Sequence, residues 1–254
     1  MGILNVTPDS FSDGGKYNDL DRALDQAKKM ERDGAHIIDI GGESTRPGHE
    51  PVSEEEEIRR VVPIIGYLSK ELNIPISIDT YKAEVARQAI EAGASIINDV
   101  WGAKEEPEIA EVAAEYGVPI ILMHNRTNKD YVALIDDMKE DLKESIAIAK
   151  AASVKDEHII LDPGVGFAKT PEDNLVVMRH LDAFQELGYP LLLGTSRKSF
   201  IGQVLDLPTE ERVEGTGATV CLGISKGAHI VRVHDVKPIA RMAKMMDAML
   251  GKGE

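Results

Sequence analysis

The chain of 254 residues has a single cysteine, Cys221, and few aromatic side chains, since Phe, Trp and Tyr make up only 4% of it. One cysteine excludes an internal disulfide and any zinc site built from several thiolates. Hydrophobic residues still reach 43% of the sequence. A chain of this length can bury a full core, which the composition predicts to be mainly aliphatic.

Basic residues are also scarce, because 29 Lys and Arg stand against 44 Asp and Glu, giving a net charge of −15. This balance argues against a nucleic-acid partner and against binding to an anionic membrane surface. An anionic substrate stays compatible with it if a few Arg and Lys gather locally. The sequence shows no secretory leader and no apolar run of membrane-spanning length, so we expect a cytoplasmic protein.

No linker rich in Pro, Gly or Ser interrupts the chain, and short apolar runs alternate with helical patterns along it. The sequence predicts eight strands, over 2–6, 35–40, 74–79, 95–98, 118–123, 159–162, 190–193 and 229–233. Helices are predicted between them, including one over 131–152 and one over 170–187. Eight such units in about 250 residues predict an α/β fold, a single-domain (β/α)₈ TIM barrel over 1–254. A doubly wound open sheet is the alternative, disfavoured because no GxGxxG follows the first strand.

The sixth predicted strand shows where to look for function. Three aliphatic residues run into Asp162, which is followed at once by the turn residues Pro163 and Gly164. A carboxylate there either caps its own turn or meets a ligand. Polar side chains stand at most other strand ends too: Asn5, Asp39, Asp79, Asn98, His124, Arg197, Lys198, Arg232 and His234. A barrel brings these ends to one mouth, where its active site lies. We expect Asp39, which precedes Ile40, to be an inward packing residue.

The strand-end residues divide into two chemical groups. Asp79, Asn98 and Asp162 offer carboxylates and an amide, which can bind a planar heterocycle along its edge by paired hydrogen bonds. Arg232, His234 and Lys198 offer donors suited to phosphate oxygens, and the Asn5 carbonyl can ligate Mg²⁺. Arg232 and His234 are two residues apart, so they share one side of a strand. The alternatives are a salt bridge from Arg232 to Asp235 and a strand-end histidine satisfied by its neighbours.

Eight motifs carry a family resemblance: MGILNVTPDSFSDGG, DIGGESTRPG, SIDT, IIND, MHN, LDPGVGFAKT, GTSRKSFIG and RVHDV. Their order and spacing over essentially the whole chain resemble bacterial dihydropteroate synthases, folate-pathway transferases blocked by sulfonamides. The resemblance implies a pterin-binding TIM barrel. It also implies the reaction of (7,8-dihydropterin-6-yl)methyl diphosphate with p-aminobenzoate, giving 7,8-dihydropteroate and pyrophosphate.

The resemblance further implies roles for individual residues. It assigns the pterin to Asp79, Asn98, Asp162, Lys198 and Thr45, and the diphosphate to Asn5, Arg232 and His234, with Asn5 holding Mg²⁺. It assigns p-aminobenzoate to Phe11, Pro47, Phe167, Lys198 and Ser199. Catalytic roles are implied for Asp79, Lys198, Arg232, His234, Asp13 and Arg46. We interpret the polar loops after the first two strands as lids that exclude water from a reactive intermediate, although they could be plain surface loops.

The family pattern also implies a homodimer. The methionines of the last predicted helix, Met242, Met245, Met246 and Met249, are a candidate interface, although such residues also serve as core. Family members normally have further residues before MGILNV, so we expect a trimmed N-terminus. Two other functions stay open, a methyltetrahydrofolate-binding methyltransferase domain and a non-catalytic pterin-binding protein. Neither explains SRKSF together with the Arg232–His234 pair.

Overall fold

The computed structural model describes residues 1–6, 16–43 and 52–252. Eight parallel strands pair in chain order, each with the next. They are β1 Gly2–Asn5, β2 Ile38–Gly41, β3 Ile76–Asp79, β4 Ile96–Asp99, β5 Ile120–Met123, β6 Ile159–Asp162, β7 Leu191–Leu193 and β8 Ala228–Val231.

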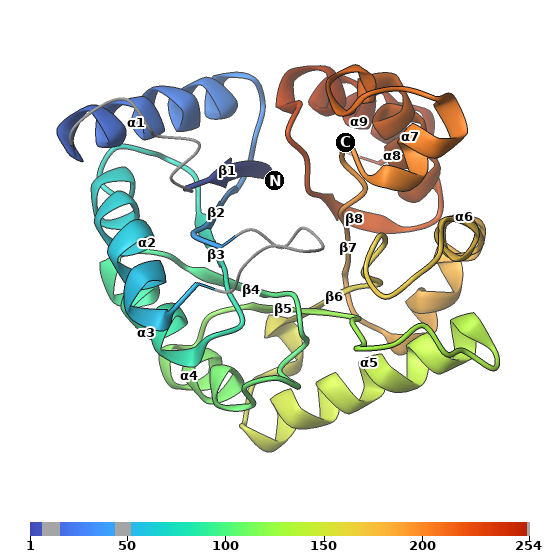
Figure 1. Cartoon of the computed structure of the whole chain (residues 1–254), viewed down its shortest axis with the longest axis horizontal. Coiled ribbons are helices and arrows are strands. Elements are labelled where there is room, and N and C mark those ends of the chain that lie inside the picture. The colour runs from blue at the N-terminus through green and yellow to red at the C-terminus, as the bar shows by residue number, and fades with distance from the viewer. Residues whose placement is uncertain (7–15, 44–51, 253–254) are drawn as a thin grey trace.

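Helices follow the strands and lie outside them (Figure 1). They are α1 Lys16–Arg32, α2 Glu54–Leu68, α3 Ala83–Ala92, α4 Glu108–Tyr116, α5 Leu134–Ala151, α6 Pro171–Arg179, α7 Ser199–Leu205, α8 Val213–Ser225 and α9 Val236–Met249. Short 3₁₀ helices are η2 Asp156–His158, η3 Leu181–Leu187 and η4 Thr209–Glu211. Among the described residues, no helix combines the length and apolarity needed to cross a membrane.

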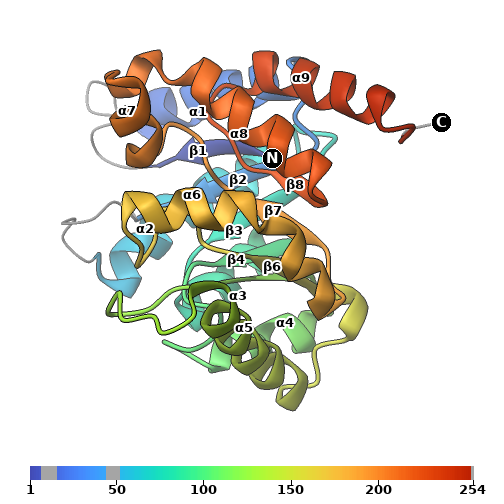
Figure 2. The same ribbon diagram turned by 90° about the vertical axis from the view of Figure 1, so that its right-hand side faces the viewer.

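The first and last strands meet and close the sheet. Gly2 pairs in parallel with Val233, just beyond β8. The amide of Ile3 donates to the Val233 carbonyl at 3.1 Å, and the amide of Val233 donates to the Met1 carbonyl at 3.0 Å. The eight βα units therefore form the predicted TIM barrel, with α6 to α9 gathered along one side (Figure 2).

Two of the predicted helices differ from the observed ones. The helix predicted over 170–187 is divided, because His180 leaves the helical region at φ −115° and ψ 24° and the chain continues as η3. Thr170 caps the start of α6 with a complete capping box. The Thr170 hydroxyl accepts from the Asp173 backbone amide, and the Asp173 carboxylate accepts from the Thr170 backbone amide. The helix predicted over 131–152 is α5, which begins three residues later, at Leu134.

The barrel interior has two layers of opposite character. A small apolar cluster fills it with Ile96, Ile121 and Leu192, joined by the partly buried Ile37, Ile160 and Ile230. Side chains two residues apart point to the same face of a strand. Two residues after the apolar layer, four of these strands therefore deliver a polar layer toward the C-terminal mouth: Asp39, Asn98, Asp162 and Arg232.

Candidate active site at the barrel mouth

The polar layer is buried although it consists of charged and amide side chains. Asp39 is 0% exposed, Asn98 4%, Asp162 5% and Asp79, which joins them from β3, 8%. The Arg232 side chain, from the segment after β8, is 20% exposed. Such burial is costly unless the groups are paired with one another or with a ligand.

One half of the mouth is built from β2, β3, β4 and the end of β8. The guanidinium of Arg232 donates from Nε to Asp39 at 2.5 Å and from a terminal nitrogen to Asp79 at 2.6 Å. The Asn98 amide donates to the same Asp39 oxygen at 3.2 Å. These contacts skip intervening strands, so the side chains meet across the interior. The expected packing role of Asp39 is confirmed, and Asp39 also pairs with Arg232.

The arrangement differs from the two separate groups that the sequence suggested, because Arg232 lies among the carboxylates predicted to bind a heterocycle. Asp235, the alternative partner suggested for Arg232, pairs with Arg197 instead. Two guanidinium nitrogens of Arg197 donate to the Asp235 carboxylate, at 2.8 and 2.6 Å. Two carboxylates on one guanidinium raise the pKa of Arg232 above its ordinary value.

Two carboxylate oxygens of this half have no partner within the described structure. They are the Oδ1 atoms of Asp39 and Asp79, both buried. Burial raises the pKa of Asp79 to about 7, although the nearby Arg232 opposes the shift. A buried carboxylate oxygen without a donor indicates that a ligand with N–H or O–H groups completes the site.

The other half of the mouth is built from β6, β7 and the loop after β6. Asp162 accepts from the Gly164 amide at 2.7 Å, and burial raises the pKa of its carboxyl while Lys198 opposes the shift. The Lys198 ammonium donates to the Val165 carbonyl and lies 4.6 Å from the centre of the Phe167 ring. Burial lowers the pKa of Lys198 to about 8. The sequence placed Asp162, Lys198 and Phe167 in one site, and the structure brings them together.

The loop after β6 needs glycine for its shape. Gly164 has φ +64°, and a Cβ there would lie 2.0 Å from the His124 carbonyl oxygen. Gly166 has φ +90°, and its amide donates to Asn174 at 2.6 Å. A Cβ at Gly166 would meet the Lys198 side chain at 2.7 Å. The glycines therefore allow the backbone to approach both β5 and Lys198.

The residues predicted to bind diphosphate lie around β1 and β8. Asn5 ends β1 and is exposed, so its amide is open to solvent at the mouth. His234 is half-buried, with its Nδ1 2.9 Å from the Ser196 hydroxyl and its backbone amide donating to the same oxygen at 3.1 Å.

Ser199, predicted to bind p-aminobenzoate, is the exposed first residue of α7. The predicted loop residues lie outside the described ones: Phe11, Asp13, Thr45, Arg46 and Pro47.

The side chains available as ligands decide which kind of magnesium site the protein could form. Among residues 1–6, 16–43 and 52–252, no group of three or more His, Cys, Asp or Glu side chains could hold a metal. Magnesium, however, is commonly held by one or two protein oxygens together with substrate phosphates and water. The single exposed amide of Asn5 fits that mode and does not fit a cage built by the protein alone.

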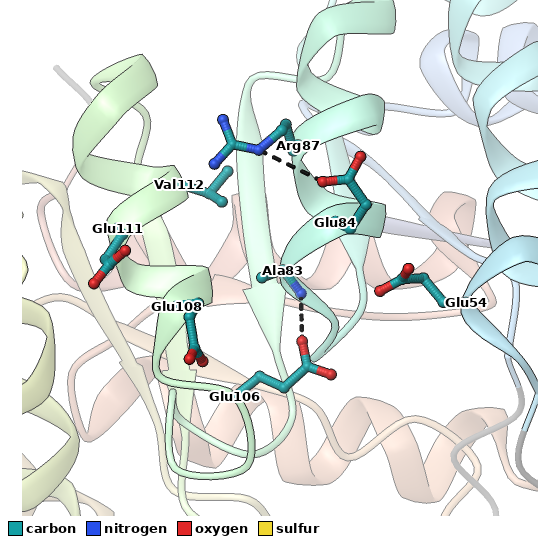
Figure 3. A pocket seen from close by; sticks show the side chains of 8 residues that line it. All are labelled: Glu54, Ala83, Glu84, Arg87, Glu106, Glu108, Glu111 and Val112. Atoms are coloured by element: carbon teal, nitrogen blue, oxygen red, sulfur yellow. Dashed lines mark hydrogen bonds and ion pairs between the residues drawn. The ribbon is translucent and has the colours of Figure 1, made fainter.

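A hollow of about 460 Å³ lies elsewhere, between the first turns of α2, α3 and α4 (Figure 3). It is lined by five glutamates, Glu54, Glu84, Glu106, Glu108 and Glu111. Among the described residues that line it, the one cation is Arg87, which lies 3.6 Å from Glu84 and 2.7 Å from Glu115. This acidic surface disfavours a diphosphate or a carboxylate, so the hollow is not the predicted site.

Two buried lysines near the mouth were not singled out from the sequence. Lys82 donates to Glu43 at 2.5 Å, to Glu57 at 2.6 Å and to the Val52 carbonyl at 2.9 Å. Lys169 donates to two carbonyls of the loop after β6. The sequence marks Lys169 only by its place at the end of the glycine-rich stretch that follows Asp162, which many surface lysines share. For Lys82, only its place three residues after Asp79 distinguishes it.

Fold and site together define a TIM-barrel protein with buried carboxylates at its C-terminal mouth, two of whose oxygens lack a donor among the described residues. A family model described as pterin binding enzyme matches residues 1–234. The chain therefore belongs to the pterin-binding enzyme family. Within that family it falls among the dihydropteroate synthases, transferases of folate biosynthesis, on the relatives that follow.

The dihydropteroate synthase of Bacillus subtilis is 70% identical over 253 residues, which cover 100% of this chain and 89% of that protein. That of Clostridium beijerinckii is 62% identical, covering 98% of this chain and 93% of that protein. The structure of the Clostridium difficile enzyme in the presence of pteroic acid has a TM-score of 0.96 and 53% identity, covering 98% of this chain and 95% of the other. The structure of the Xanthomonas albilineans enzyme with 4-aminobenzoic acid has a TM-score of 0.94 and 40% identity, covering 100% of this chain and 93% of the other.

Proposed function

We propose that the chain condenses (7,8-dihydropterin-6-yl)methyl diphosphate with p-aminobenzoate, releasing pyrophosphate and forming 7,8-dihydropteroate. The observation that carries this reaction is the buried polar layer, with its unpartnered carboxylate oxygens on Asp39 and Asp79. The pteroic acid in the Clostridium difficile structure and the 4-aminobenzoic acid in the Xanthomonas albilineans structure support the same chemistry.

In this proposal the pterin ring lies in the mouth between the two halves. Asp79 and Asp162 accept from ring N–H and amino groups, and Asn98 offers one donor and one acceptor. The Lys198 ammonium, already directed into the mouth above Phe167, donates to a ring heteroatom. Three anchors on β3, β4 and β6 fix the ring in its plane, so that the reacting methylene faces the open end of the barrel.

The diphosphate lies toward the ends of β1 and β8 in the proposed complex. Arg232 and His234 supply donors to its oxygens, and the Asn5 carbonyl would hold Mg²⁺. That cation, when bound, neutralises charge on the leaving diphosphate. Arg232 reaches the phosphate side without leaving Asp79, since a guanidinium has five N–H donors and the described ion pairs use two of them.

We further propose that the C–O bond breaks before the amine attacks. An arylamine is a weak nucleophile, whereas the methylene cation is delocalised into the electron-rich dihydropterin. The carboxylates of Asp79 and Asp162 stabilise this positive charge, with no covalent intermediate on the protein. The amine nitrogen then forms the new C–N bond and loses its proton.

Binding of p-aminobenzoate tests the order of events. It should require both the pterin substrate and pyrophosphate, because pyrophosphate holds the cation in place. Calorimetric titration with p-aminobenzoate, with each component omitted in turn, measures this. Equal affinity in the absence of pterin and pyrophosphate would exclude the cationic path.

Pyrophosphate release separates the three candidate functions. Release that depends on p-aminobenzoate and Mg²⁺ identifies the synthase. A methyltransferase domain or a non-catalytic binding protein releases none. Single alanine variants at Phe11, Asp13, Thr45, Arg46, Pro47 and Ser199 test the proposed loop and p-aminobenzoate roles in the same assay.

We also propose a cytoplasmic homodimer formed by the side of the barrel that carries α7, α8 and α9 (Figure 2). This side exposes Val204 at 62%, Leu222 at 39%, Met245 at 59% and Met249 at 60%. Met242 and Met246 instead pack against the core, so only part of the methionine cluster is available. Sedimentation of the wild type and of a Val204→Ser, Met245→Ser variant tests the dimer, and cell fractionation tests the location.

A further inference from the structure

The loop after β6, residues 163–169, is held by a buried side chain to which the reaction assigns nothing. Lys169 is 5% exposed, and its ammonium has three partners. It donates to the Gly164 carbonyl at 3.0 Å and to the Phe167 carbonyl at 2.9 Å. Its third partner is Nδ1 of His124, at 3.0 Å. When Nζ is protonated, all three of its donors are therefore used inside the protein, and burial lowers the pKa of Lys169 to about 7.

His124 connects this ammonium to the next helix. Its Nε2 lies 2.9 Å from the Asp141 carboxylate of α5, which also accepts from Arg126. Burial and the nearby Lys169 lower the pKa of His124 to about 3, so the ring is neutral. A neutral ring that accepts at Nδ1 carries its proton on Nε2 and donates it to Asp141. Lys169 is thus anchored through the ring to α5.

The two carbonyls that Lys169 holds bracket the part of the loop that touches the site. Between them lie the Val165 carbonyl, which accepts from Lys198, and the Phe167 ring beneath the same ammonium. The Gly164 amide, on the other side of the first held carbonyl, donates to Asp162. A shift of this loop would therefore move the partners of both Asp162 and Lys198.

We propose that Lys169 is a positioning residue, which fixes the loop 163–169 on β5 and α5 and thereby sets where Lys198 and Asp162 present their charges to the pterin. Lys169 itself touches no reacting atom. The inference rests on the pterin-binding roles of Asp162 and Lys198 in the proposed function.

A second contact on the same loop gives an independent variant. The Tyr131 hydroxyl donates to the Ala168 carbonyl at 3.0 Å, one residue before Lys169. Tyr131→Phe removes this hydrogen bond and keeps the ring, which is half-buried. It disturbs the loop less than Lys169→Met does and is expected to fold.

The test is a double-mutant cycle on kcat/KM for the pterin substrate. Lys169→Met keeps the apolar stem, removes the three donors and should lower kcat/KM on the order of 100-fold, as misplacement by about 1 Å does. In a Lys198→Met background the same change should cost less, because one of the two groups that it positions is gone. Tyr131→Phe should show the same pattern with a smaller loss.

Leu68→Ala is the matched control. Leu68 is fully buried at the C-terminal end of α2, at the opposite end of the barrel from the mouth. This variant should lower the Tm while leaving kcat/KM unchanged, alone and in the Lys198→Met background. It thereby separates loss of stability from loss of positioning.

If the loss of kcat/KM in a double variant equals the product of the losses of Lys198→Met and of the loop variant alone, the two changes are independent and the proposal is overturned. An unchanged kcat/KM in Lys169→Met would overturn it as well. If Lys169→Met does not fold, the Tyr131→Phe cycle decides alone. A wild type that forms no dihydropteroate would instead refute the proposed function, so the two failures are distinguishable.

Discussion

The two halves of the mouth each hold a buried aspartate near a buried cation, but they do so differently. On the β3 and β8 side, Arg232 contacts Asp39 and Asp79 directly, at 2.5 and 2.6 Å. On the β6 and β7 side, Asp162 and Lys198 are each bonded to the loop backbone, to the Gly164 amide and the Val165 carbonyl. The first half is held by its own charges, and the second depends on the shape of one loop.

This difference has an energetic meaning. Removing one partner of a buried ion pair leaves the other charge without compensation and destabilises the fold. Removing a cation that donates only to a carbonyl leaves a neutral acceptor, which costs far less. The halves can therefore be told apart by which substitutions affect stability and which affect only binding.

The largest effect is expected from Asp162→Ala. It removes the carboxylate that we propose to receive the pterin in the loop-dependent half, so pterin binding should weaken by about 10³-fold or more. The barrel should remain folded, since the main partner lost is one loop amide. Calorimetry with the pterin substrate and circular dichroism measure the two outcomes.

The matched control is Asp99→Asn, at the end of β4. Asp99 is also buried, and its carboxylate accepts from the Trp101 and Ala103 amides at 2.8 and 2.5 Å. Pterin affinity should stay near the wild-type value in this variant. Normal pterin binding by Asp162→Ala would remove the basis for the whole site.

The second prediction compares the two cations. Arg232→Met should lower both activity and stability, by about 3 kcal/mol in the free energy of unfolding, because two buried carboxylates lose their partner. Lys198→Met should lower kcat/KM strongly with little change in stability. Denaturant unfolding of both variants measures the contrast, and equal stability losses would show that the halves are held alike.

The third prediction concerns pH. Activity should fall below about pH 7, where Asp79 gains a proton and loses its negative charge, and above about pH 8, where Lys198 loses its proton and its positive charge. Lys198→Arg should remove the alkaline fall, because a guanidinium stays charged throughout this range. Profiles of kcat/KM report these groups in the free enzyme. An alkaline limb that persists in Lys198→Arg belongs to another group.

The smallest effect is expected from Asp39→Asn. In the wild type, the negative charge of Asp39 raises the pKa of Asp79, and this change removes that charge. The acid limb should therefore move to lower pH, while activity at neutral pH changes only a few-fold, since Arg232 keeps its contact with Asp79. An unmoved acid limb would mean that Asp79 does not govern it.

The barrel and most of the site could be predicted because their signals are local. Apolar runs ending in Asp79, Asn98 and Asp162 show both the strands and their mouth-facing ends. The pairing of Asp39 with Arg232 could not be predicted, since it joins residues 193 positions apart and depends on how the barrel closes. From the sequence, Asp235 was only the alternative to a diphosphate role for Arg232, offered because it is near in the chain.

Lys169 shows a second limit. Its residue type and place, after a glycine-rich turn, resemble those of any surface lysine near a loop. In the fold, Gly164 approaches the His124 carbonyl, and the Lys169 ammonium bonds to three acceptors beside it. That approach is a tertiary property with no periodic pattern in the sequence.

The bridge between Gly2 and Val233 has a consequence for how the chain folds. Until the last strand docks, Asp39 and Asp79 have no guanidinium and remain hydrated, which opposes their burial. Barrel closure and neutralisation of the mouth are therefore one late event, governed by contacts far apart in the chain. We expect competence to bind a pterin to arise only after the segment that carries Arg232 has docked.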